Sequence, residues 1–295
     1  MVNFISDIRH STAALLGLAI GDAMGAPLEG VVRPAAPVRR MYAGGRIARH
    51  SGACTDDTYQ ALALAESLAA CRGFSPPDFM ERLVRDYLFF GEWYGPTSGA
   101  VFSLVIGGTP LYSAARLVHA RRGWSRSNGS VMRGPPIGVF YFGPEVEAAS
   151  MACSALTHRD PVAGACSAFV NRMVSDMCRG MPKERAYARA LQRCRDAEVA
   201  GMLGRWREFP PSPGLDALEA THAAVSVFME TFSFEEAVPR AVSMGGDSDT
   251  VGAIAGALAG AAYGMHSIPE EWIRGLSDSG RVLRAAHALW LASRG

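Results

Sequence analysis

Two apolar stretches at opposite ends of the chain carry glycine at every fourth position. The glycines are Gly17, Gly21 and Gly25 in the first stretch, and Gly252, Gly256, Gly260 and Gly264 in the second. Glycine inside a helix costs about 1 kcal/mol relative to alanine, and residues four apart lie on the same helix face. A glycine stripe therefore predicts close approach of another helix, and we expect these two helices at the centre of the fold.

Apolar residues elsewhere recur mostly at helical spacing, and strand-like alternation is rare. Gly/Pro-rich stretches, such as 134–138, separate the expected helices, and no low-complexity linker interrupts the chain. We therefore predict an all-α protein in which residues 1–295 form one multi-helix domain. N-terminal caps are expected at Thr55, Asp78 and Ser233. The expected helices lie near 7–24, 57–72, 77–90, 97–106, 110–120, 144–157, 160–179, 183–200, 215–230, 233–243, 249–264 and 279–293.

Composition narrows the classes of function. The formal net charge of +1 argues against a surface built for nucleic-acid backbone, although arginines between 116 and 133 leave a local basic patch open. Lys183 is the sole lysine, which argues against lysine-based catalysis. The six cysteines form no C-x-x-C pair, so a zinc site is not expected, and their scatter suits a reducing compartment.

The chain shows no signal-peptide pattern, because Asp7, Arg9 and His10 precede the first apolar run. No apolar run is expected to reach the roughly 18 residues of a spanning helix. We therefore expect a cytoplasmic monomer without a membrane partner. The segment from Glu29 to Cys54 is the longest irregular stretch, and loops of such length are often functional.

Two short acidic clusters open apolar helices. One is Thr55-Asp56-Asp57-Thr58 and the other is Asp247-Ser248-Asp249-Thr250. Each taken alone is typical of a capped helix start, where the helix dipole favours carboxylates. Together, carboxylate and hydroxyl oxygens are the ligands that Mg²⁺ and Mn²⁺ prefer. If the fold brings the clusters together, they would hold one or two divalent cations.

Four segments in order resemble the ADP-ribosylglycohydrolase family across nearly the whole chain. They are GLAIGDAMG at 17–25 with Glu29, TDDT at 55–58, NGSVMR at 128–133 with Pro136, and GGDSDT at 245–250; Thr157-His158 also fits. The resemblance implies an all-α fold, two Mg²⁺ or Mn²⁺ ions, and hydrolysis of the bond between ADP-ribose and an acceptor. The expected partner is ADP-ribose or an ADP-ribosylated acceptor such as a protein.

The resemblance also implies site residues. The implied metal ligands are Thr55, Asp56, Asp57, Asp247, Asp249 and Thr250. The implied catalytic residues are Glu29, Asp56, Asp57 and Asp249. The implied substrate-binding residues are Gly95, Thr97, Ser98, Asn128, Gly129, Ser130, Met132, His158, Gly245, Gly246 and Ser248.

Several roles stay open. Backbone N–H groups at 128–132 and at Gly245-Gly246 are candidates for binding the pyrophosphate. Arg133 would either pair with phosphate or brace its loop. His158 would either contact the ligand or serve as a structural group.

One position departs from the family pattern. Arginine-specific members carry an Asp shortly before a Gly-x-Thr loop, where this chain has Trp93, next to Glu92. The departure argues against arginine-linked substrates, and Trp93 and Tyr94 would instead stack on an aromatic group. The alternatives are an ADP-ribose-binding protein without turnover and a structural protein on the same fold. A serine hydrolase is not supported, because no G-x-S-x-G occurs. Arginine, serine, a nucleic-acid end or a metabolite all remain open as acceptors.

Overall fold

The structure is a computed structural model that describes residues 7–34, 36–45 and 49–294. Over these residues the regular elements are helices and no strand is present, so the all-α prediction is confirmed. The α-helices are α1 (Ile8–Gly25), α2 (Asp56–Cys71), α3 (Pro76–Phe90), α4 (Pro96–Ile106), α5 (Leu111–Arg122), α6 (Gly129–Met132), α7 (Pro135–Phe140), α8 (Glu145–Ala155), α9 (Pro161–Met177), α10 (Lys183–Arg193), α11 (Ala197–Gly204), α12 (Ala217–Glu230), α13 (Phe234–Val242), α14 (Ser248–Tyr263), α15 (Glu270–Gly275) and α16 (Ser279–Ala292). Short 3₁₀-helices are η1 (Ala26–Leu28), η2 (Gly91–Trp93), η3 (Trp206–Glu208) and η4 (Met265–Ser267).

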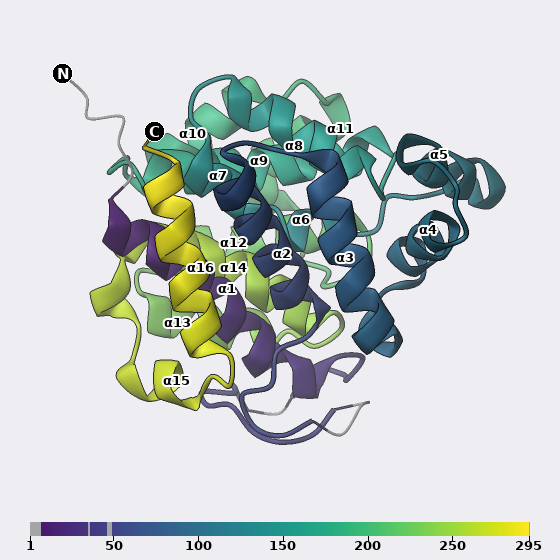
Figure 1. Ribbon diagram of the computed structural model, residues 1–295. Coiled ribbons are helices and arrows are strands. Elements are labelled where there is room, and N and C mark those ends of the chain that lie inside the picture. Colours follow the sequence, from purple (N-terminus) through teal and green to yellow (C-terminus); the bar gives the residue numbers. More distant parts are fainter. Residues whose placement is uncertain (1–6, 35, 46–48, 295) are drawn as a thin grey trace.

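Helices α1 and α14 pack along their lengths at the centre of the molecule (Figure 1). A Cβ atom added at Gly21 would lie 2.0 Å from the carbonyl oxygen of Gly252. A Cβ atom at Gly256 would lie 2.0 Å from the carbonyl oxygen of Gly17. The two backbones therefore touch at positions where any larger residue would clash, which confirms the prediction made from the glycine spacing.

The other helices surround this central pair. Helix α2 packs between α3 and the C-terminal helix α16, and α9 packs against α7, α8, α10 and α12. Helix α13 covers another part of α14. Helices α4 and α5 pack against each other and project from one side of the molecule (Figure 1). The N-terminal ends of α2 and α14 are thereby held next to the short helix α6.

Some element boundaries differ from the sequence-based expectation. The helix expected over 183–200 is two helices, because the Asp196 side chain accepts from the backbone N–H groups of Glu198 and Val199, both at 3.0 Å, and starts α11. The break expected at 134–138 is instead helix α7, whose prolines occupy its first two positions, where the missing N–H groups cost nothing. The short helices α6 and α15 were also not expected.

The expected caps are confirmed at two of three helix starts. The side chains of Thr55 and Ser233 accept hydrogen bonds from backbone N–H groups of the first turn of α2 and α13. The expectation for Asp78 is wrong, because α3 begins earlier, after Ser75, and Asp78 lies inside its first turn.

One stretch is long and apolar enough to cross a membrane by length and composition. It runs from Ile8 to Leu28 with a mean hydropathy of 1.3, which corrects the expectation that no such run exists. In the fold 94% of this stretch is buried, and it contains the fully buried Asp22. Its burial against α14 is typical of a core helix.

Candidate functional site

The first acidic cluster forms the N-terminus of α2. Thr55 is the N-cap residue, and its hydroxyl accepts from the backbone N–H of Asp57 at 3.2 Å. Asp56 and Asp57 follow in the first turn, where the helix dipole stabilises negative charge. Both carboxylates are buried, at 9% and 3% exposed, so they lie inside the protein rather than on its surface.

The second acidic cluster forms the N-terminus of α14. Asp247 precedes the helix without a capping hydrogen bond from its side chain, and Asp249 lies in the first turn. Gly245 and Gly246 before it both have positive φ, at 78° and 64°, a conformation that glycine adopts readily. A Cβ atom at Gly246 would lie 2.2 Å from the carbonyl oxygen of Pro213, so the turn also needs glycine for space.

Gly246 is not a free donor for a pyrophosphate. Its N–H donates to the carbonyl of Val31 at 3.0 Å, while its carbonyl accepts from Gly30 at 2.8 Å. These bonds tie the loop after η1 to the start of α14. The pyrophosphate-binding expectation for this backbone group is therefore wrong, and its role is to hold the turn.

Asp22 is a site residue that the sequence-based list omitted. It lies near the end of α1, fully buried, and accepts from the backbone N–H of Thr55 at 2.9 Å and of Thr58 at 3.2 Å. It also accepts from the Thr58 hydroxyl at 2.5 Å. The carboxylate thus fixes the first turn of α2 to the central helix. A polar residue inside the otherwise apolar run of α1 was the signal in the sequence.

The segment at Asn128 joins the second cluster to α6. The Asn128 amide donates to the Asp247 carboxylate at 2.5 Å, and the Thr250 hydroxyl donates to the Met132 sulfur at 3.7 Å. Both contacts lie across the interface between α6 and α14. The resemblance grouped these residues by motif, and the structure brings them into direct contact.

Other expected substrate-binding residues lie around α6. A Cβ atom added at Gly129 would lie 3.0 Å from the His158 ring and 3.5 Å from the Ser98 hydroxyl, so Gly129 packs against both side chains. Ser130 is buried, with its hydroxyl bonded to Ser154. The hydroxyl of Ser248 donates to the carbonyl of Gly25. Thr97 and Ser98 are buried at the start of α4, whereas the Gly95 that caps this helix is exposed.

Arg133 and His158 are both buried and internally bonded. Arg133 donates to the Gln60 side chain at 2.9 Å, to the Thr157 hydroxyl at 2.7 Å and to a backbone carbonyl, so it braces α2 and the loop before α9. The ring nitrogens of His158 contact the hydroxyls of Thr157 at 2.7 Å and Ser127 at 2.9 Å. Burial lowers the pKa of His158 to about 3, which keeps the ring neutral.

Aromatic residues border the first cluster. Trp93 stacks with Phe90, with ring centroids 4.5 Å apart, and the Arg49 guanidinium lies 4.9 Å from the Trp93 ring centroid. Tyr94 is buried and meets Tyr87 edge-on at 5.5 Å. The expectation that Tyr94 stacks on a ligand is therefore wrong, because its ring is already packed inside the protein.

Burial raises the pKa of the clustered aspartates, and neighbouring carboxylates add to this rise at Asp56, Asp57 and Asp249. Burial raises the pKa of Asp56 to about 8, and the charge of Asp22 adds to this rise. Burial and then the charge of Asp249 raise the pKa of Asp57 well above its usual value. Burial, followed by the charges of Asp247 and Glu29, does the same for Asp249. These carboxylates are therefore close enough to interact strongly.

Such a cluster fits a divalent cation in its chemistry. Several buried carboxylates can be ionised together only if positive charge compensates them. The Oδ2 atom of Asp57 and the Oδ1 atom of Asp22 are buried and accept no hydrogen bond, so both keep free lone pairs. All-oxygen donors suit Mg²⁺ or Mn²⁺. Within the described ranges, however, no three His, Cys, Asp or Glu side chains are already grouped as ligands of one ion.

Glu29 lies at the edge of this cluster. It follows η1, is partly exposed, and its charge raises the pKa of both Asp247 and Asp249. It is thus the carboxylate of the site with access to solvent. Carboxylates from the loop after η1, from α2 and from α14 therefore lie close enough to affect one another's pKa.

Comparisons with known proteins agree with this geometry. The family model described as ADP-ribosylglycohydrolase matches residues 6–295. The chain is 30% identical over 298 residues to the ADP-ribosylarginine hydrolase Tri1 of Serratia proteamaculans, covering 96% of this chain and 79% of the relative. It is 29% identical to the ADP-ribosyl-dinitrogen reductase glycohydrolase of Rhodospirillum rubrum, covering 90% and 89%.

A further sequence relative and a solved structure point the same way. The human ADP-ribosylhydrolase ARH3 is 27% identical, with 74% of this chain and 73% of the relative covered. A solved ADP-ribosylglycohydrolase-related protein complex superposes with a TM-score of 0.86 and 33% identity, covering 97% of this chain and 98% of that one. The fold and the site thus define an all-α hydrolase with a buried carboxylate cluster where two central helices meet. The chain belongs to the ADP-ribosylglycohydrolase family.

Proposed function

We propose that this protein hydrolyses the glycosidic bond between ADP-ribose and an acceptor, and that the reaction depends on Mg²⁺ or Mn²⁺. One observation carries the proposal most directly. Asp56, Asp57, Asp247 and Asp249 are buried at two neighbouring helix starts, and burial together with the charge of a neighbouring carboxylate raises the pKa of each. A cluster of this kind is costly to the fold unless it has a cationic ligand.

The proposed metal ligands are the oxygens of the two clusters. They are Thr55, Asp56, Asp57, Asp247, Asp249 and Thr250. A divalent cation bound there would supply a Lewis acid for ribose hydroxyls and lower the pKa of a water molecule.

The protein's own residues orient the site and handle protons. Asn128 fixes the Asp247 carboxylate through its 2.5 Å hydrogen bond, and Asp22 fixes Thr55 and the first turn of α2. Glu29, partly exposed at the rim, is placed to take a proton from the attacking water or to give one to the leaving group. The glycosidic bond breaks at the anomeric carbon, water adds its oxygen there, and the acceptor leaves with a proton.

One positive charge lies beside the first acidic cluster. The Arg49 guanidinium lies over Trp93, and its charge offsets a small part of the rise in pKa that burial causes at Asp22 and Asp56. A second guanidinium would be repelled there. We therefore expect a neutral acceptor, such as a serine-linked ADP-ribosyl protein, to be hydrolysed faster than an arginine-linked one, in contrast to the named activity of the Serratia relative.

The test compares Asp249→Asn with Asp78→Asn. Both changes remove one carboxylate charge from the first turn of a helix, but Asp78 is paired with Arg82 on the surface of α3. Turnover of ADP-ribosylated serine, arginine and nucleic-acid substrates would be measured with Mg²⁺, with Mn²⁺ and with chelator. We expect loss of metal binding and turnover in the Asp249 variant alone. Chelator-resistant activity, or an unaffected Asp249 variant, would show the proposal to be wrong.

A further inference from the structure

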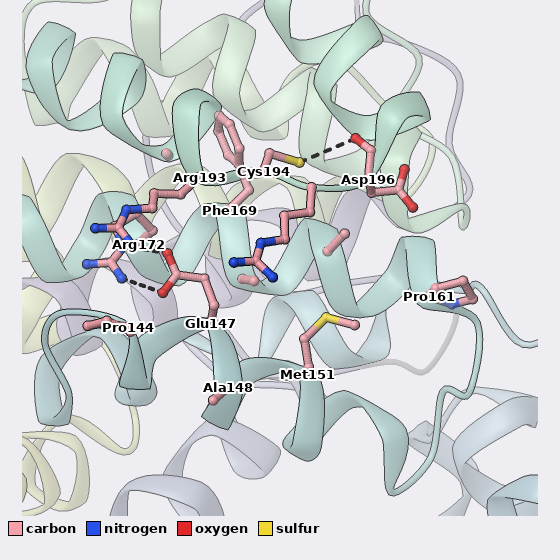
Figure 2. A pocket seen from close by; sticks show the side chains of 14 residues that line it. Pro144, Glu147, Ala148, Met151, Pro161, Phe169, Arg172, Arg193, Cys194 and Asp196 are labelled. Carbon is pink, nitrogen blue, oxygen red and sulfur yellow. Dashed lines mark hydrogen bonds and ion pairs between the residues drawn. The ribbon is translucent and has the colours of Figure 1, made fainter.

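A cavity lies on the side of α9 that faces α8 and the α10–α11 connection (Figure 2). Its volume is about 520 Å³, within the range of roughly 300–1,000 Å³ typical of small-molecule sites. It shares no residue with the carboxylate site.

The middle of the cavity is apolar. Ala165, Ala168 and Phe169 line it from α9, and Ala148 and Met151 line it from α8. The Met151 side chain faces the open space in Figure 2 and is 41% exposed. Phe169 and Ala168 are buried, so the accessible apolar surface comes from Ala148, Met151 and Ala165, whose small or flexible side chains leave space for a flat apolar group.

The rim of the cavity is basic. Arg193 ends α10, and Arg195 lies in the break before α11, where the sequence predicted a continuous helix. Neither arginine makes an ion pair or a side-chain hydrogen bond within the described part of the chain. The helix break thus presents two cations to one cavity, and Asp196 is occupied in capping α11.

Arg172 also lines the basic end of the cavity. Its side chain is 1% exposed and forms a two-point ion pair with Glu147, at 2.9 and 2.5 Å. The Nη1 atom is buried without a hydrogen-bond partner, 3.8 Å from the nearest Asp176 oxygen. Figure 2 shows Arg172 and Arg193 extending toward the same end of the cavity, with Asp196 at the other end. Glu147 neutralises Arg172, so the two exposed arginines leave a net positive charge.

We propose that this cavity binds a small organic anion with a flat apolar body and a phosphate or carboxylate group. The flat body lies over Ala165 of α9 and Met151 of α8, the apolar lining residues that remain accessible. The anionic group lies against Arg193 and Arg195, whose planar guanidinium groups match both phosphate and carboxylate. The site is separate from the proposed hydrolase reaction and does not depend on it.

The test uses probes that separate the apolar from the anionic part. Binding of AMP, 1-naphthoate, adenosine and inorganic phosphate to the full chain would be measured by calorimetry. We expect AMP or 1-naphthoate to bind at least tenfold more tightly than adenosine and phosphate. AMP serves as the phosphate arm and 1-naphthoate as the carboxylate arm.

Matched variants then locate the binding. The double change Arg193→Ala and Arg195→Ala should weaken binding at least tenfold, and Ala165→Leu should weaken it by filling the floor. Arg284→Ala, an exposed arginine on α16, should leave it unchanged. If the affinity responds to Asn128→Ala instead, the probe binds the carboxylate site and the proposal is wrong. Equal binding of all four probes, or none, would also overturn it.

Discussion

The contact between α1 and α14 makes a quantitative prediction for Gly21→Ala. The added Cβ atom would lie 2.0 Å from the Gly252 carbonyl oxygen, whereas ordinary contact begins near 3.4 Å. The two backbones must therefore separate by about 1.4 Å (3.4 minus 2.0) at this point. The obstructing carbonyl oxygen belongs to the backbone, so it cannot move aside by a change of rotamer as a side-chain atom could.

Two opposing effects determine how Gly21→Ala changes the free energy of unfolding. Alanine gains about 1 kcal/mol over glycine in helix propensity. Overpacking a well-packed core costs about 1–3 kcal/mol or more, and a backbone clash of this depth belongs at or above the upper end. We expect a net loss of about 2 kcal/mol or more, which in a chain of this size lowers the Tm by at least about 3 °C.

Gly201→Ala provides a matched control with the opposite sign. Gly201 lies within α11, and a Cβ atom there would meet nothing within 4 Å. The same chemical change should therefore raise the unfolding free energy by about 0.5–1 kcal/mol.

Urea unfolding followed by helical circular dichroism would measure both variants. The midpoints should shift in opposite directions with an unchanged m value, because the surface exposed on unfolding is the same. Mn²⁺ affinity should fall for Gly21→Ala only, since α1 and α14 carry Asp22 and Asp249. If both substitutions stabilise the protein equally, the two backbones do not touch and the reasoning is refuted.

Three further predictions concern the site. Asp22→Asn should lower the unfolding free energy by about 1–3 kcal/mol in denaturant titration, because a charged acceptor of hydrogen bonds from Thr55 and Thr58 is lost; an unchanged midpoint would contradict this. The folded-state pKa of Asp56, about 8, lies above its unfolded value of 3.8, so the metal-free chain loses stability as the pH rises toward 8, and Mn²⁺ should bind more tightly over that range. Calorimetry of Mn²⁺ binding in two buffers of different ionisation heat should then detect proton release, and equal binding heats in the two buffers would contradict this prediction. The pKa of His158 is about 3 in the folded chain and 6.5 in the unfolded chain. Below pH 6.5 the unfolded chain therefore binds one more proton, and the unfolding free energy falls by about 1.4 kcal/mol per pH unit. His158→Gln should reduce this dependence of the unfolding free energy on pH, and the same slope in variant and wild type would argue against a buried neutral ring.

Local features were accessible from the sequence because they depend on near neighbours. Helix periodicity, the caps at Thr55 and Ser233 and the glycine stripes all concern residues within one or two turns. The break between α10 and α11 was missed because the helical periodicity of 183–200 outweighed the single capping residue Asp196. The helix α7 was missed because its two leading prolines also mark loops.

The site could be predicted only in part. The two acidic clusters were evident from their composition, and the structure brings them together at neighbouring helix starts. The role of Asp22 was not evident, because it depends on donors more than 30 residues away, at Thr55 and Thr58. Likewise the hydrogen bond used by Gly246 depends on Val31, which lies far away in the sequence.

The sequence by itself determined the helical class, the central glycine-striped pair and the oxygen-rich chemistry of the clusters, because each follows from residue type and short-range spacing. The tertiary structure decided which polar groups are free. Hydrogen bonds and burial depend on residues brought together from distant parts of the chain. Hydrogen bonds within the protein use the polar groups of Gly246, Arg133 and His158. Burial raises the pKa of the clustered aspartates, and Arg193 and Arg195 remain unpaired beside an apolar cavity.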